Sequence, residues 1–235
     1  MIKKVMERIK KTAEDFGLIY DPRFFNYILA TREELVLRNF ISGCPEYNFE
    51  KFGKTLEKRV KNIGRFVNSS EFKKHVKEAQ GCVINKIQAL QEQRFIRSWA
   101  RGSWRKKLLK VYDKILVHCI DELILVFKPE TKKEQAISEG VLSHELMHQL
   151  LDHNNIEFAK LNSKNWEIDE GLATYLDHYS IGKHKLLEKK QKKGKSEMHN
   201  IYAENGRTFA LLLNKLKTPQ QRIDVLRKYY DKMKR

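Results

Sequence analysis

The sequence predicts a predominantly helical α+β fold with one small sheet. Glycine and proline together fill only 15 of 235 positions, and 41% of the residues are hydrophobic, which is typical of a helix-rich globular protein with a sizeable core. Apolar residues recur every three to four positions along most of the chain, as on the buried face of a helix. Only near the middle does this pattern give way to β-branched, apolar runs of the kind found in strands.

Residues 1–110 are expected to form a helical, basic region whose role the sequence leaves open. Val5, Ile9 and Ala13 mark the apolar face of a first helix. A second helix is expected from Pro22 to Phe40, with the preceding aspartate as its cap. Further helices are predicted over residues 50–67 and 70–99, with Gly81 as a possible interruption of the last.

Residues 111–235 are expected to hold the sheet and the chemistry. Residues 114–120 and 122–127 read as two short strands or one bent strand. Four helices are then predicted, separated by Asn154-Asn155, by a lysine-rich tract over 183–195 and by Thr218-Pro219. These helices cover residues 133–153, 166–179, 197–216 and 219–234.

Charge is distributed unevenly along the chain. The net charge is +17, but residues 119–180 carry 12 acidic against 5 basic residues, whereas residues 1–118 carry 13 against 26. The flanking positive charge is compatible with nucleic acid, with acidic substrates or with simple solvation of helices. The segment 99–107 interleaves Trp99 and Trp104 with basic residues, so its rings could stack on bases and its cations bind phosphates. More often such a segment is a helix with buried tryptophans and solvated lysines.

Cysteine usage and hydropathy indicate a cytoplasmic protein. Cys44, Cys82 and Cys119 are far apart and form no CxxC pair, so neither a disulfide framework nor a cysteine metal site is expected. No stretch approaches the roughly 18 apolar residues of a membrane span, and the basic N-terminus is not followed by a signal-like apolar run. We therefore expect no membrane association.

The most informative motif is His144-Glu145-Leu146-Met147-His148, an HExxH sequence inside an apolar-periodic stretch. A spacing of four places His144 and His148 one turn apart on one helix face, where both imidazoles can bind a single Zn²⁺. Glu145 is then positioned to accept a proton from a water ligand of the metal. The motif predicts a helix with a catalytic zinc site.

The third metal ligand has several candidates. The extended motif HExxHxxGxxH is excluded because Leu151 and Asn154 stand where glycine and histidine would be needed. His153 follows His148 by five residues and would face elsewhere on the helix. The acidic segment 167–170 offers Glu167 and Glu170 on the next predicted helix.

Taken with this second segment, the chain resembles the gluzincin metallopeptidases. The HExxH motif is followed by Asp169-Glu170-Gly171-Leu172-Ala173, close to the family's Asn-Glu-Gly-aromatic-Ala. The resemblance implies a zincin-like core over residues 111–235, one Zn²⁺ per chain, and Glu170 rather than Glu167 as third ligand. It covers roughly residues 123–213, less than half of the chain.

The resemblance also implies supporting roles for other residues. Asp177 corresponds to the family's carboxylate that orients the first histidine. Tyr202 corresponds to its oxyanion-stabilising tyrosine, although Tyr202 precedes Gly206 by four residues instead of three. His178 and His199 are alternatives without a motif around them. The strand over 122–127 would be an edge strand to which an extended peptide adds, or else ordinary buried sheet.

The leading hypothesis is thus a zinc metallopeptidase acting on a peptide or protein substrate. Two alternatives remain at this point. The first is a nucleic-acid-associated protein with a protease-like zinc core, and the second is a catalytically latent protein in which zinc only holds the fold. Whether a peptidase of this sequence would trim termini or cut internally is left open.

Overall fold

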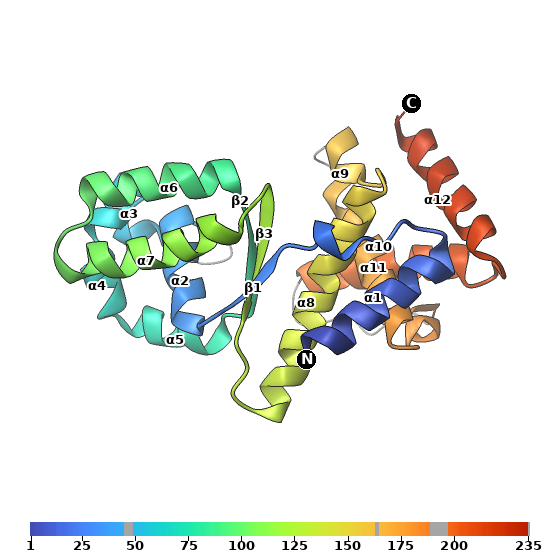
Figure 1. The fold of residues 1–235 in the computed structure, drawn as a ribbon, viewed down its shortest axis with the longest axis horizontal. Coiled ribbons are helices and arrows are strands. Elements are labelled where there is room, and N and C mark those ends of the chain that lie inside the picture. Colours follow the sequence, from blue (N-terminus) through green and yellow to red (C-terminus); the bar gives the residue numbers. More distant parts are fainter. Residues whose placement is uncertain (45–48, 163–164, 189–196, 235) are drawn as a thin grey trace. The chain divides into compact units, whose positions relative to one another are not determined.

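The computed structural model describes residues 1–44, 49–162, 165–188 and 197–234, and it is predominantly helical with a single three-stranded sheet (Figure 1). The expected fold class, α+β and mostly helical, is confirmed. Contacts divide the chain into two compact units. We call Asn26–Val141 the sheet unit, and Met1–Phe25 together with Leu142–Arg235 the HExxH unit.

This division differs from the boundary near residue 110 expected from the sequence. The first helix, α1 (Ile2–Phe16), packs on α10 (Trp166–Ser180) and α12 (Pro219–Lys234) at the other end of the chain. Val5, Ile9 and Ala13 are fully buried there, as their spacing predicted. The N-terminal helix therefore completes the core of the C-terminal part.

The sheet lies wholly within the sheet unit. It consists of β1 (Tyr27–Ala30), β2 (Gly81–Asn85) and β3 (Glu122–Phe127) in the order β1-β3-β2. β3 runs parallel to β1 and antiparallel to β2, so both of its edges are paired. The expectation that residues 122–127 form an edge strand open to a peptide is wrong, because both hydrogen-bonding edges of β3 are already used.

Two further strand and helix expectations are corrected here. Residues 114–120 do not form a strand, because α7 (Gly102–His118) includes most of them and buries Ile115 against the core. Residues 27–30, expected to be helical, form β1, and the helix begins at Thr31, whose side chain and that of Glu34 form a capping box. Gly81 does interrupt the helical pattern, since it begins β2.

Helices cover one face of the sheet (Figure 1). α2 and α6 contact β2, and α7 contacts β1. A stacked and edge-to-face group of phenylalanines, which includes Phe40, Phe49 and Phe66, fills the core beside α2. The helical elements of this unit are α2 (Arg32–Ser42), the short η2 (Glu50–Phe52), α3 (Leu56–Lys61), α4 (Ile63–Val67), α5 (Ser70–Glu78), α6 (Lys86–Trp99) and α7.

Helix α8 (Lys132–His153) runs through the unit boundary and carries the HExxH motif. It is preceded by Thr131, whose hydroxyl accepts a hydrogen bond from the Glu134 N–H while the Glu134 carboxylate accepts one from the Thr131 N–H. It ends where Asn155 adopts a left-handed conformation (φ 55°) and the N–H of the following residue bonds back to Leu151. The predicted helix end at Asn154-Asn155 is confirmed.

The rest of the HExxH unit is helical. Its core includes Leu146, Leu150, Leu172, Tyr175 and Phe209, all at most 1% exposed. The remaining elements are η1 (Pro22–Phe24), α9 (Phe158–Leu161), α10, η4 (His184–Glu188), α11 (Glu197–Leu213) and α12. Part of the lysine-rich tract over 183–195 lies outside the described residues. Within the part of the chain that the structure describes, no helix has the length and apolar character needed to cross a membrane.

Candidate metal centre

The HExxH motif lies on α8 with its apolar and polar residues on different faces. Leu142, Leu146 and Leu150, at helical spacing, are fully buried and fix this face of the helix against the core. The side chains of His144 and His148 keep 21% and 27% of their surface exposed. The apolar register therefore holds the helix while both imidazoles remain accessible.

Helix α10 brings Glu170 to the two histidines. Its Oε2 lies 3.0 Å from Nε2 of His144 and 3.5 Å from Nε2 of His148, and the two imidazole nitrogens are 3.3 Å apart. Of the His, Cys, Asp and Glu side chains that the structure describes, these are the only three gathered closely enough to hold a metal ion together. Glu167 does not belong to this group.

The three atoms fit a small metal ion in both chemistry and spacing. Ligand atoms in a tetrahedral zinc site have bonds of about 2.0–2.1 Å, which places any two of them about 3.3 Å apart. The observed triangle of 3.0, 3.3 and 3.5 Å matches this spacing. Two imidazoles and one carboxylate suit zinc, and they also suit other first-row divalent ions.

Charges in the centre are strongly coupled. Burial disfavours ionisation of Glu170, but hydrogen bonds with His144 and His148 outweigh it and lower the pKa of the carboxyl to about 2. Burial likewise lowers the pKa of His148, but the hydrogen bond and the charge of Glu170, assisted by Glu145 and Asp169, outweigh it, so that this pKa is raised. The carboxylates of Glu170, Glu145 and Asp169 thus place negative charge around the two imidazoles, which suits a cation.

Asp169, the residue before Glu170, makes a buried contact that the sequence did not reveal. It is 5% exposed, and its Oδ1 accepts a hydrogen bond of 2.7 Å from the N–H of Phe158. This bond ties the start of α9 to the first turns of α10. The sequence shows Asp169 only as a neighbour of Glu170 in the family motif and does not indicate its hydrogen bond to Phe158.

Gly171, the residue after Glu170, allows a close approach of α11. A Cβ placed on Gly171 would lie 2.3 Å from Cβ of Asn205, closer than real atoms come. One on Gly206 would lie 3.5 Å from the carbonyl oxygen of Gly171. The near neighbour of Gly171 is thus α11 and not the HExxH helix.

The contact between α10 and α11 brings Tyr202 near the three side chains of the candidate metal centre. It precedes Gly206 by one helical turn, and its ring centroid is 6.1 Å from that of His144 at an interplanar angle of 26°. The spacing of four, which departs from the family pattern, is the spacing that keeps a tyrosine and a glycine on one helix face. The structure therefore brings Tyr202 beside the histidines.

The other candidate residues lie outside the group. His153 stacks on Phe24, with ring centroids 3.7 Å apart, and Nδ1 of His178 is 2.9 Å from the carbonyl oxygen of Thr174 on its own helix. No hydrogen bond between Asp177 and either motif histidine is found among the described residues. The side chain of His199 is outside the described part of the chain.

Comparison with known proteins gives no relative to which the site could be matched. No family model, no characterised protein and no solved structure matches the chain. The class of site therefore rests on the geometry of the three side chains alone.

Proposed function

We propose that this protein is a zinc-dependent metallopeptidase of the gluzincin type, with a zincin-like core that includes the HExxH helix α8 and α10. One observation carries the proposal: the convergence of His144, His148 and Glu170 with no fourth ligand among the described residues. Structural zinc sites usually have four protein ligands, whereas catalytic sites have three and keep one position open. The partial exposure of all three side chains supports an open site.

The proposed chemistry assigns each residue one task. Zinc held by the three ligands would lower the pKa of a bound water and polarise the scissile carbonyl. Glu145, one residue after His144, accepts the proton of the attacking water and returns it to the leaving amine. The proximity of Glu145 to the centre is supported by its effect on the pKa of His148.

The test combines metal analysis with a peptide-library digest read by mass spectrometry. We expect about one zinc per chain in both the wild type and Glu145→Gln, and cleavage by the wild type alone. Glu167→Gln is the matched control, because it makes the same chemical change on α10 outside the metal-binding group, and it should cleave like the wild type. Wild-type protein that holds zinc and cleaves nothing would instead identify a structural zinc protein, and a Glu145→Gln variant that cleaves at the wild-type rate would exclude the proposed base.

A further inference from the structure

The helical hairpin of α6 and α7 carries an unusual concentration of positive charge. The two helices pack together and are joined by Ala100 and Arg101 alone. Between Glu78 and Asp113 the chain has eight lysines and arginines and a single acid, Glu92. Because Glu92 is 3% exposed and accepts the hydroxyl of Tyr112 at 2.6 Å, it does not offset the charge at the surface.

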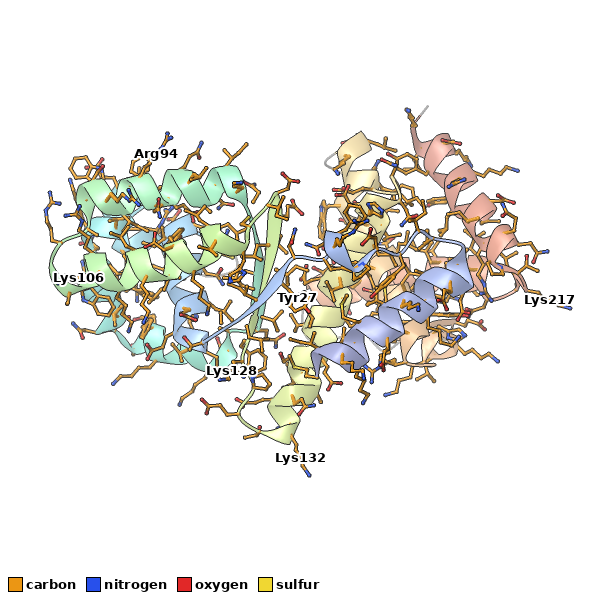
Figure 2. All side chains as sticks on the ribbon, viewed as in Figure 1. Tyr27, Arg94, Lys106, Lys128, Lys132 and Lys217 are labelled. Carbon is orange, nitrogen blue, oxygen red and sulfur yellow. The ribbon has the colours of Figure 1, made fainter. Side chains whose placement is uncertain are left out.

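Six of these residues form what we call the basic corner. They lie on the last turns of α6, in the connection and on the first half of α7, all of them are exposed, and within the described chain none of them pairs with a carboxylate. Figure 2 labels two of them, whose side chains project away from the ribbon. The six are Arg94, Arg97, Arg101, Arg105, Lys106 and Lys110.

Some lysines near the corner pair with acids, in contrast to its six residues. Lys107 lies 3.0 Å from Glu33 and Lys114 lies 3.1 Å from Glu34. Lys61 lies 2.6 Å from Glu57, one turn earlier on the same helix. Like charges at helical spacing repel each other by a few tenths of a kcal/mol per pair, roughly 0.2–0.5 kcal/mol. A bound polyanion would therefore relieve the repulsion among the six cations of the corner.

The tryptophans beside the corner are committed to packing. Trp99 is partly buried and covered by Lys61, whose Nζ is 4.1 Å from the ring centroid. Trp104 is partly buried against Gly64 and lies under Lys107. The sequence hypothesis that these two rings stack on bases is not favoured, since each ring is partly buried against the core and has a lysine over it.

We propose that the basic corner binds the phosphate backbone of a double-stranded nucleic acid without reading its sequence. A duplex presents about one charge per 1.7 Å of axis, and guanidinium groups bind phosphate oxygens in pairs. Cations held on two packed helices suit such a rigid, regular array of phosphates. A single strand would instead be held by several exposed aromatic side chains, and of the aromatic side chains on α6 and α7 only Phe95, 39% exposed, is open to solvent.

The test measures binding of the full chain to a labelled duplex of about 20 base pairs by fluorescence anisotropy, between roughly 50 and 200 mM salt. In the variant Arg94→Glu/Arg97→Glu/Arg105→Glu we expect a loss of affinity of roughly tenfold or more and a salt slope smaller by about 3. The matched control is Lys217→Glu/Arg227→Glu/Lys228→Glu, which changes the net charge equally at exposed positions of the HExxH unit and should lose less than about threefold. Circular dichroism and thermal melting establish that both variants fold.

Three results would overturn the proposal. Equal loss in both variants would mean that overall charge, not the basic corner, drives binding. Tighter binding to an unpaired strand of the same length would make the partner a single strand. Tighter binding to vesicles rich in phosphatidylserine than to the duplex at equal salt would identify a lipid surface. None of these binding measurements depends on peptide hydrolysis, so they test the basic corner separately from the proposed peptidase activity.

Discussion

Gly171 and Asn205 approach so closely that a methyl group on the glycine would lie 2.3 Å from Cβ of the asparagine and 2.7 Å from its carbonyl carbon. Gly171 directly follows Glu170, and Tyr202 lies one turn before Asn205 and Gly206 on the facing helix. The crossing of α10 and α11 therefore sets the positions of Glu170, a candidate metal ligand, and of Tyr202 at the same time.

We predict that Gly171→Ala lowers the free energy of unfolding by roughly 1–3 kcal/mol, because the added methyl meets backbone and Cβ atoms that cannot move independently. It should also weaken zinc binding, since α10 must shift with Glu170. The control is Gly140→Ala on α8, where an added Cβ meets nothing within 4 Å, and where the helix should gain about 0.5–1 kcal/mol. Urea unfolding and zinc titration measure both effects. Equal stability of the two variants would show that α11 can move away without cost.

The identity of the third ligand gives a second prediction. Removing the carboxylate in Glu170→Ala should reduce zinc affinity by at least about 100-fold, because one of three ligands is lost. Glu167→Ala, on the same helix and outside the group, should bind zinc as the wild type does. Competition with a chromogenic chelator gives both affinities. A loss in Glu167→Ala alone would reverse the ligand assignment.

A third prediction concerns pH in protein kept free of metal by a chelator. The pKa of Glu170 is lowered from 4.5 to about 2, so its contribution to stability is present above pH 4.5 and is lost as the pH falls towards 2. The pKa of His148 is raised from 6.5, so its contribution is present below pH 6.5 and is lost as the pH rises through the raised value. Their interaction should stabilise the protein most between these limits.

The measurement compares the wild type with Glu170→Gln, which keeps the shape of the side chain and removes its charge. The difference in free energy of unfolding should reach at most about 3 kcal/mol near pH 5.5 and shrink on either side. With zinc present the trend should be the opposite on the alkaline side, since metal binding releases the proton of His148 and strengthens as the pH rises. If the difference in free energy of unfolding between the two proteins did not change with pH, an ion pair between Glu170 and His148 would be excluded.

The sequence predicted the local parts of the centre well. The spacing of His144 and His148 depends only on helix geometry, and the apolar positions around them fix which face is buried. The choice of Glu170 over Glu167 came from the family motif, and the structure places Glu170, not Glu167, with the histidines. The roles of Asp169 and Gly171 were missed because each depends on a partner in another helix, Phe158 in α9 or Asn205 in α11.

The strands were the least predictable part of the fold. Residues 114–120 have strand-like side chains, but their place in α7 is decided by packing of Ile115 in the core, which overrides propensity. Tyr27–Ala30 is a four-residue strand that is paired only through β3, almost one hundred residues later. No local pattern marks such a partner or such a core contact, so both errors arise from tertiary contacts.

The last prediction concerns Tyr202, whose ring lies beside His144 without being one of the three ligands. If its hydroxyl stabilises the oxyanion, Tyr202→Phe should lower kcat by roughly 100-fold while KM and the zinc content stay close to those of the wild type, because the interaction forms only in the transition state. The matched control is Tyr230→Phe in α12. It removes a hydroxyl from a ring that packs on Phe158 and should leave kcat unchanged. A loss of zinc in Tyr202→Phe would instead mean that the phenol supports the ligand His144, and an unchanged kcat would reduce Tyr202 to a packing residue of the α10–α11 contact.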